Sequence, residues 1–205
     1  MSFTQSLIYM IKNSSWFSKL ILLILFFFSV YCLALIISRY RYYKQLVKER
    51  LRIRRYLRTH PEGERLTLTR KGNSPYYFLL RLISRGISRQ ELKSKTDQII
   101  NDFLVEEETK LSFLATTSGV APFIGLLGTV VGITRAFWSI GLKGSASLLV
   151  LAPGLAEALI TTIAGLSVAI PAFIAYHYFI NKLSLIEKEL VNLIEEVISR
   201  MQRTG

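Results

Sequence analysis

Three long apolar blocks, separated by polar and basic stretches, set the pattern of the chain. The first block, residues 20–37, is an uncharged run of 18 residues between Lys19 and Arg39. Since about 20 helical residues cross the hydrocarbon of a bilayer, this run predicts a transmembrane helix over residues 19–38. A cleaved signal peptide is disfavoured, because the run leads into basic residues rather than a small-residue cleavage site. Upstream, apolar residues at helical spacing predict that residues 1–18 lie on the membrane surface.

The second and third apolar blocks lie close together. They predict transmembrane helices over residues 113–140 and 146–180, and only residues 141–145 separate them. The two spans are therefore expected to form an antiparallel hairpin. The third block is longer than a bilayer is thick, so it either tilts or projects into water. An apolar stripe at helical spacing continues through residues 181–205 and favours a helix that projects well out of the membrane.

A helix start precedes the second span. Ser88 and Glu91 have the spacing of a capping box, and Ile87 and Leu92 stand at the matching hydrophobic-staple positions. Apolar residues then recur at intervals of three, four or seven, and no strong helix breaker comes before Gly119. The sequence predicts one long helix that begins near Ser88 and runs straight into the second span.

The basic residues determine the expected orientation. The net charge is +12, and residues 39–110 hold 18 Lys and Arg against 9 Asp and Glu. By the positive-inside rule, residues 39–112, a basic helical domain, are expected in the cytoplasm together with the C-terminus. The N-terminus and the hairpin turn are then expected outside. A DNA-binding function is the alternative, but a membrane-proximal cytoplasmic loop is expected to be basic. Loops and turns are expected at Pro61, Gly63, Gly72 and Pro75.

The composition provides few of the residues that catalysis or metal binding needs. The one cysteine, Cys32, cannot form an internal disulfide, and the two histidines, His60 and His177, are far apart. Zinc spacings, a Ser/His/Asp triad, a phosphate-binding loop and a dinucleotide fingerprint are all missing from the sequence. We predict an all-α integral membrane protein with three transmembrane helices, the second and third extending into the cytoplasm. It is expected to be no enzyme and to hold neither a metal nor a cofactor.

Spans two and three are rich in small residues. Gly128 and Gly132 form a GxxxG pair, and span three has two more pairs of small residues at the same spacing. Lipid provides no hydrophobic drive between helices, so association depends on close contact, which small residues permit. The pattern predicts tight association within and between subunits; the alternative is ordinary bundle packing in a monomer. The residues expected to take part are Gly125, Gly128, Gly132, Gly154, Gly165, Pro122, Pro153 and Pro171.

Glu157 is the only charged residue well inside span three. A charge at bilayer depth costs about 2.5–3.5 kcal/mol on insertion scales, so Glu157 is a functional candidate. Thr161 lies one turn further on the same helical face, Thr162 follows it, and Thr129 lies at mid-depth in span two. These groups can line a polar path; alternatively, each threonine bonds back to its own helix. Because the spans hold no aspartate, we expect a partner that brings a membrane carboxylate.

Two segments resemble a known family. Residues 114–133, LATTSGVAPFIGLLGTVVGI, resemble the second-span signature of the ExbB and TolQ proteins. Residues 152–171, APGLAEALITTIAGLSVAIP, resemble their third-span signature. The two blocks also have the spacing of that family, and the resemblance extends over residues 88–203. The first span and the basic segment agree only in layout, and both the cytoplasmic loop and the C-terminal tail are short for the family.

The resemblance implies a homopentamer in the inner membrane of Gram-negative bacteria. Its central pore is expected to hold the helices of two ExbD-like or TolR-like single-span subunits, with lipids around it and no nucleic acid. Proton flow is expected to rotate the pentamer, while a TonB-like or TolA-like protein carries the work across the periplasm. By motif, Thr129, Glu157 and Thr162 match the pore-lining residues of the family. Helical geometry alone favours Thr161 as the companion of Glu157, so it stays a candidate.

The expected function is therefore that of a motor subunit that uses the proton motive force to energise TonB-dependent outer-membrane transport. A TolQ-type role in the Tol-Pal system of envelope integrity and cell division is the alternative within the family. A passive membrane scaffold, whose polar residues only pack helices, and an autonomous ion channel are alternatives of other classes. Glu157→Gln distinguishes the motor from the scaffold, because a scaffold tolerates the change and a motor that titrates this carboxyl group does not.

Overall fold

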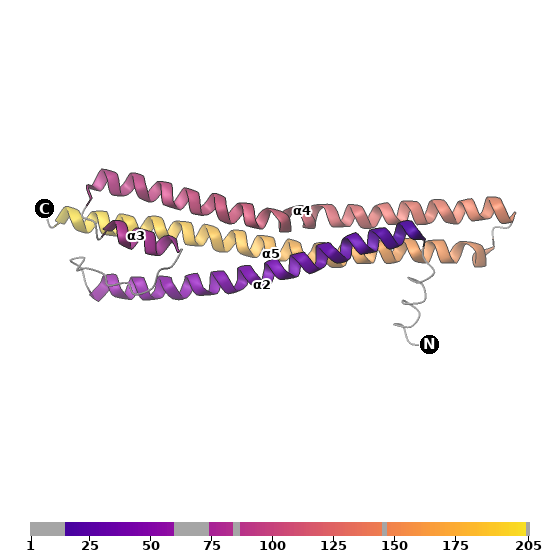
Figure 1. Cartoon of the computed structure of the whole chain (residues 1–205), viewed down its shortest axis with the longest axis horizontal. Coiled ribbons are helices and arrows are strands. Elements are labelled where there is room, and N and C mark those ends of the chain that lie inside the picture. Colours follow the sequence, from indigo (N-terminus) through magenta and orange to yellow (C-terminus); the bar gives the residue numbers. More distant parts are fainter. Residues whose placement is uncertain (1–14, 60–73, 84–86, 145–146, 204–205) are drawn as a thin grey trace. The chain divides into compact units, whose positions relative to one another are not determined.

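The computed structural model describes residues 15–59, 74–83, 87–144 and 147–203, and every element in these ranges is an α-helix. Three of the helices are long and apolar enough to cross a membrane, which confirms the predicted all-α fold with three candidate spans. The predicted surface segment up to residue 14, and the turns at Pro61, Gly63 and Gly72, lie outside the described residues. The helices are α2 (Trp16–Thr59), α3 (Pro75–Ile83), α4 (Arg89–Lys143) and α5 (Leu148–Arg203) (Figure 1).

Helix α2 begins earlier and ends later than the first predicted span. Ser15 precedes it, and the Ser18 N–H donates to Ser15 Oγ at 3.2 Å, which is the contact of an N-cap. The helix therefore starts at Trp16 rather than at residue 19. It continues to Thr59 because the basic segment after the apolar run contains neither glycine nor proline. The predicted span and the first part of the predicted basic helical domain are thus one helix of 44 residues.

Helix α4 confirms the predicted long helix into the second span. The Glu91 N–H donates to Ser88 Oγ at 3.3 Å, so Ser88 is the N-cap. The Glu91 carboxylate does not reach back to complete the capping box and instead accepts from Lys95 Nζ at 2.6 Å. At the far end, Gly144 has a φ of 62° and its N–H donates to the Ile140 carbonyl at 2.9 Å, a helix C-terminus that favours glycine.

Helix α3 is an element that the sequence analysis did not predict. Pro75 was interpreted as a turn residue, but it is the first residue of α3, where a missing N–H costs nothing and the fixed φ suits a helix. The Tyr77 N–H donates to the Ser74 carbonyl at 3.0 Å and closes the first turn. Five of the nine residues of α3 are buried, so packing stabilises a helix too short to persist alone.

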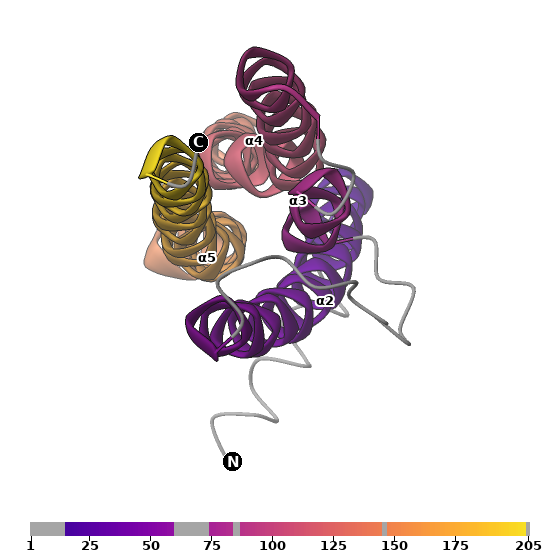
Figure 2. The same cartoon turned by 90° about the vertical axis from the view of Figure 1, so that its left-hand side faces the viewer.

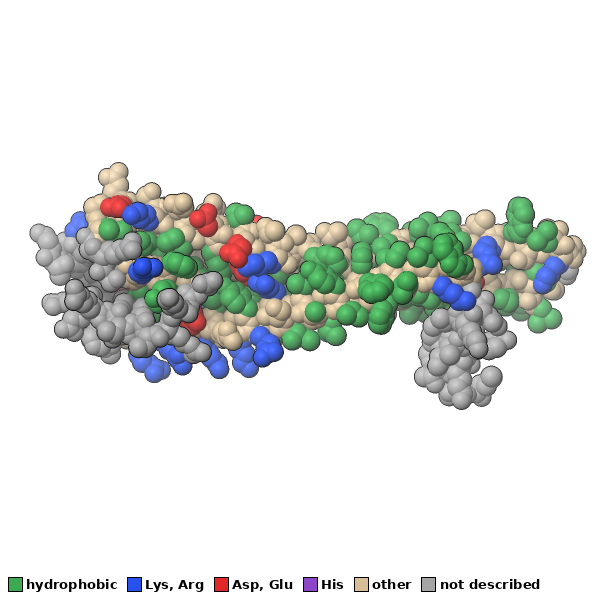
Figure 3. Space-filling model, in the orientation of Figure 1, with side chains coloured by type: hydrophobic (Ala, Val, Ile, Leu, Met, Phe, Trp, Pro, Cys, Tyr) green, Lys and Arg blue, Asp and Glu red, His purple; other side chains and the backbone are tan. Residues whose placement is uncertain are grey.

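The chain divides into two compact units, and the three long helices each contribute to both. Unit 1 comprises Met1–Ile36 and Ser112–Tyr176, and unit 2 comprises Ile37–Leu111 and His177–Gly205. In unit 1, the part of α2 after its first turn packs through Ile21 and Leu25 against α4 and α5. The buried side chains that α4 and α5 contribute are mostly small. Many large apolar side chains of unit 1 are exposed instead (Figure 3), among them Phe27, Leu126, Phe137 and Leu159.

Unit 2 has a different interior. In Figure 2, the segments of α2, α3, α4 and α5 that form this unit surround a common interior. Large apolar side chains fill it, and Tyr43 of α2 stacks on Phe179 of α5 with ring centroids 5.5 Å apart. Further buried side chains in this interior are Leu46, Tyr76, Leu79, Leu92, Leu111, Leu183 and Leu190.

Candidate functional site

The hairpin of unit 1 brings the backbones of α4 and α5 very close together. A Cβ atom built on Gly132 lies 2.9 Å from Ala158 Cβ, and one built on Gly154 lies 2.9 Å from Ala136 Cβ. Real Cβ atoms do not approach so closely, so at these positions only glycine fits without a shift. The small residues that were predicted to permit close association therefore lie where these two helices touch.

The same seam continues toward the other end of the hairpin. A Cβ on Gly165 lies 2.6 Å from the Ala121 carbonyl oxygen, and one on Gly125 lies 2.8 Å from the Thr161 carbonyl oxygen. Gly128 faces the side chain of Thr161, whose atoms fill the space that a Cβ needs. Three prolines of the predicted set lie inside the helices, each removing one helical hydrogen bond: Pro122 in α4, and Pro153 and Pro171 in α5.

The three candidate threonines occupy different environments. Thr161 is fully buried against Gly128 and donates to the Ala158 carbonyl at 2.7 Å. Thr129 also bonds to its own helix, donating to the Leu126 carbonyl at 2.6 Å. Thr162 is half-buried and donates across the hairpin to the Gly125 carbonyl at 3.3 Å. Thr161 thus has a packing position inside the seam, and Thr162 joins the two helices by a side-chain hydrogen bond.

Glu157 is held by two other helices of unit 1. The Ser15 N–H and hydroxyl both donate to Glu157 Oε1, at 2.8 and 2.6 Å, at the start of α2. Arg135 of α4 places Nη1 3.6 Å from the same oxygen. Ser18 Oγ lies 3.1 Å from Ser15 Oγ, so the Ser18 hydroxyl is a neighbour of the Ser15 hydroxyl that binds Glu157. The Glu157 side chain is 13% exposed.

Sequence reasoning missed the partners of Glu157. Ser15 is 142 residues away in the sequence, and nothing in the sequence pairs the two. For Arg135 a signal does exist. The small-residue contacts pair Gly132 with Ala158 in an antiparallel register, which places Arg135 within two residues of the position opposite Glu157. Aligning the two small-residue stripes therefore predicts that this arginine and Glu157 are close.

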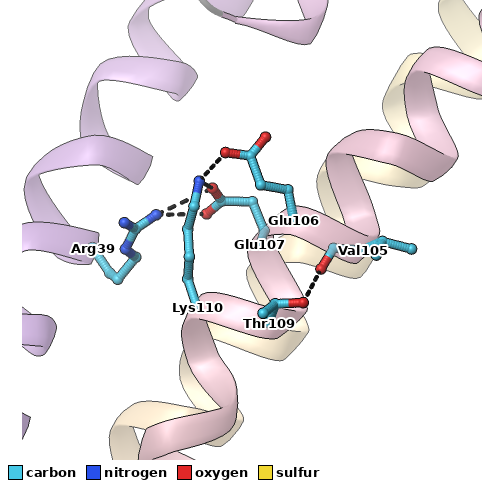
Figure 4. A network of polar contacts seen from close by, with 6 residues as sticks. All are labelled: Arg39, Val105, Glu106, Glu107, Thr109 and Lys110. Atoms are coloured by element: carbon cyan, nitrogen blue, oxygen red, sulfur yellow. Dashed lines mark hydrogen bonds and ion pairs between the residues drawn. The ribbon is translucent and has the colours of Figure 1, made fainter.

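A second group of charges lies in unit 2. In Figure 4, Arg39 of α2 points toward Glu107 of α4, and its Nη1 lies 3.1 Å from both carboxylate oxygens. Lys110 Nζ lies 2.9 Å from Glu107 Oε1 and 2.5 Å from Glu106 Oε1. The Glu107 side chain is only 2% exposed. Its charge is compensated by two cations, so this network ties α2 to α4.

Residues 67–192 of the chain match the model of the MotA/TolQ/ExbB proton channel family. This is more than half of the chain and includes both segments on which the resemblance rests. The chain belongs to the MotA/TolQ/ExbB proton channel family. The predicted family is therefore confirmed, together with its membrane-embedded character.

Relatives of this proton channel family carry both names that the sequence suggested. The chain is 44% identical over 96 residues to the Tol-Pal system protein TolQ of Haemophilus influenzae. The matched region covers 47% of the chain and 42% of that protein. The chain is also 44% identical over 101 residues to the biopolymer transport protein ExbB of Xanthomonas campestris pv. campestris, which covers 47% and 39%. ExbB of Neisseria gonorrhoeae is 34% identical over 111 residues, covering 54% and 49%. The chain spans less than half the length of these curated relatives.

Carboxyl groups are scarce in unit 1 of this proton channel family member. By sequence, Glu157 is the one carboxyl group of this unit. Among the described residues, no three His, Cys, Asp or Glu side chains come close enough to hold a metal ion. Unit 1 therefore offers Glu157 as its one candidate carboxyl group.

Proposed function

We propose that this chain is a subunit of a homopentameric inner-membrane motor that works with an ExbD-like or TolR-like single-span partner. The motor uses the proton motive force to energise TonB-dependent outer-membrane transport. The observation that carries this proposal is Glu157, the one carboxyl group of unit 1, which is held by hydrogen bonds in a member of a proton channel family. A polar group that costs this much to bury in a membrane is kept for a function.

The proposed pore residues are Thr129, Glu157 and Thr162, with Thr161 as the further candidate. The burial of Thr161 against Gly128 favours Thr162, which is half-buried. Because unit 1 has no second carboxyl group, proton transfer needs a partner that supplies one. That partner is the single-span subunit with an aspartate in its span, and a TonB-like protein couples the motion to the outer membrane.

The proposed orientation places the N-terminus and the α4–α5 turn in the periplasm and unit 2 in the cytoplasm. It rests on the excess of Lys and Arg in residues 39–110. Lys143 and Lys95 are both exposed and suit a labelling test in a Cys32→Ser background. A membrane-impermeant thiol reagent added outside is expected to reach Lys143→Cys and to miss Lys95→Cys. Labelling in the opposite sense refutes this orientation.

A TolQ-type role in the Tol-Pal envelope system is the second candidate. The identity of 44% to TolQ of Haemophilus influenzae supports it as strongly as the ExbB relatives support the first candidate. The two candidate roles predict different phenotypes when the gene is deleted. Loss of energy-dependent uptake through outer-membrane receptors indicates the first role, and envelope leakage with defective constriction indicates the second.

The decisive experiment for the motor is proton flux in liposomes that contain the chain with and without its single-span partner. Flux is expected only with the partner, and native mass spectrometry is expected to give five copies of the chain. The triple variant Glu157→Ala, Thr129→Val, Thr162→Val is expected to abolish flux while the protein still assembles. Full flux in this triple variant refutes the pore assignment, and a stable monomer refutes the pentamer.

A further inference from the structure

The contact between Ser15 and Glu157 has the form of a helix cap that is completed by another helix. In a capping box, the residue at the third helical position accepts a hydrogen bond from the N–H of the N-cap residue. That position in α2 is Ser18, whose own N–H donates to Ser15 Oγ, as expected for the first half of the box. The second half comes from α5, because Glu157 Oε1 accepts the Ser15 N–H at 2.8 Å.

Three groups around this cap attract the Glu157 carboxylate. The N-terminus of a helix carries partial positive charge and stabilises a nearby anion. The Ser15 hydroxyl donates at 2.6 Å, the short distance of a charge-assisted hydrogen bond. Arg135 lies further away, at 3.6 Å, and its side chain is 55% exposed, so solvent screens this pair. Ser15 is therefore the main anchor, and Arg135 acts as a weaker counter-charge.

The two oxygens of Glu157 are not equivalent. Both hydrogen bonds from Ser15 end at Oε1, and so does the ion pair with Arg135. The Ser18 side chain also contacts the carboxylate by a hydrogen bond. An oxygen anchored in this way fixes the orientation of the carboxylate.

We propose that Ser15 and Arg135 are positioning residues of Glu157 and form with it a clasp, named here the Ser15 clasp. The clasp holds Oε1 against the first turn of α2 and presents Oε2 for proton exchange. The proton comes from a partner carboxylic acid or from water, binds Oε2 and returns by the same route, and no other bond is made or broken. A neutral Glu157 accepts the Ser15 hydrogen bonds less strongly, so proton occupancy is coupled to how firmly α2 is held. The exchange step rests on the function proposed above.

The clasp itself is testable without any transport assay. Hydrogen–deuterium exchange of the full assembled chain in nanodiscs reports the protection of the amides at the start of α2. Glu157→Ala is expected to raise exchange in a peptide covering residues 15–20 by about tenfold, the effect of losing a hydrogen bond to a charged group. Ser15→Ala should give a smaller rise, because the Ser15 N–H still reaches Glu157. Because Ser15→Ala also removes the cap on the Ser18 N–H, the double variant should show a rise that is larger than either single rise but smaller than their sum.

Thr134→Ala is the matched control for these variants. Thr134 is the neighbour of Arg135, but its hydroxyl donates to Val130 of its own helix at 2.7 Å. It is expected to leave exchange at the start of α2 unchanged. Equal exchange in the unchanged chain and in Glu157→Ala overturns the clasp, as does a fully additive Ser15→Ala, Glu157→Ala double variant.

The positioning role is tested by partner-dependent proton flux, with conservative variants as the decisive readout. Ser15→Thr keeps a capping hydroxyl and Arg135→Lys keeps the charge, so both should retain most of the flux. Ser15→Ala and Arg135→Gln should lower it severalfold at unchanged protein level. Normal flux in Ser15→Ala and Arg135→Gln, with Glu157→Ala inactive, refutes the positioning role. If the unchanged chain with its partner carries no flux, the proposed function fails, whereas the exchange measurement still decides the clasp.

Discussion

Two glutamates, one in each unit, are held in contrasting ways. Glu107 in unit 2 is 2% exposed, and both of its oxygens lie 3.1 Å from Arg39 Nη1. Glu157 in unit 1 is held by Ser15 through one oxygen, and its nearest cation, Arg135, lies 3.6 Å away and is exposed. Removing the Glu107 carboxylate would leave the largely buried Arg39 without its main partner. Glu157 is thus anchored mainly at a single oxygen, beside a weaker and more exposed counter-charge than those of Glu107.

The interiors of the two units also differ, in the size of the side chains that they bury. Unit 1 joins α4 and α5 through glycine and alanine, so closely that a Cβ added to Gly165 would lie only 2.6 Å from the Ala121 carbonyl oxygen. Unit 2 buries leucine and aromatic side chains. Lipid provides no hydrophobic drive, so helices in a membrane gain from close contact. In water, burying apolar area itself stabilises the fold, and large side chains bury the most.

The largest expected effect comes from breaking the small-residue seam of unit 1. Gly165→Leu places a side chain against the backbone of Ala121 and Gly125, which cannot move aside without separating the helices. We expect a loss of about 3 kcal/mol or more, at or above the upper end for overpacking, together with loss of assembly. Thermal unfolding and native mass spectrometry measure both. Gly119→Leu is the control, because no atom lies within 4 Å of a Cβ at that position.

A similar but smaller effect is expected from breaking the charge network of unit 2. Glu107→Ala leaves Arg39 largely buried without its partner and should cost about 2–3 kcal/mol, less than a fully buried pair because Lys110 is partly exposed. Glu106→Ala removes a neighbouring carboxylate that is mostly exposed and should cost no more than about 0.5 kcal/mol. Chemical denaturation in detergent compares the two. Equal costs contradict a structural role for Glu107.

The sequence predicted the features that depend on local pattern. The three spans followed from charged and apolar residues that are segregated along the chain, and α4 followed from the cap at Ser88 and the lack of breakers. Helix α3 was missed because Pro75 favours a turn and a first helical turn equally, and burial decided between them. Burial is a property of the packed unit, so the local sequence does not report it.

The candidate site was predicted only in part for a related reason. Glu157 stood out because a lone charge in an apolar block is unusual, but its anchor, Ser15, comes from a distant helix. Helical spacing grouped Thr161 with Glu157, yet it does not tell which face of α5 meets α4. In the structure that face contains Thr161, which packs on Gly128. Which residues share a seam depends on the register of two helices, and spacing within one helix does not fix it.

Glu157→Gln sharpens the comparison of the two glutamates. Glutamine keeps an acceptor for Ser15 but loses the charge, so we expect a stability loss of about 1 kcal/mol, below that of Glu107→Ala. Partner-dependent proton flux should nevertheless be lost if Glu157 titrates during the cycle. Flux that survives in Glu157→Gln and fails in Glu157→Ala instead indicates a polar lining group, with the partner carboxylate handling the proton. Flux in the folded fraction of Glu107→Gln should be normal.

The smallest expected effect is that of Tyr76→Phe in unit 2. Tyr76 of α3 is buried, and its hydroxyl donates to Glu189 Oε2 over a long 3.5 Å, while Arg50 holds the other carboxylate oxygen at 2.7 Å. Removing the hydroxyl should therefore cost less than about 1 kcal/mol at neutral pH.

The pH dependence gives the Tyr76→Phe prediction its sharpest test. Burial, and next the Glu189 carboxylate, raise the pKa of Tyr76 above its usual 10.0, so the folded unit favours the neutral phenol. A raised pKa in the folded state means that this contribution to stability is complete below pH 10 and is lost as the pH rises further. The stability difference between the unchanged chain and Tyr76→Phe should then shrink above pH 10. Denaturant titrations of both proteins at pH 8 and above pH 10 measure this difference, and a gap that widens with pH contradicts the burial of a neutral Tyr76.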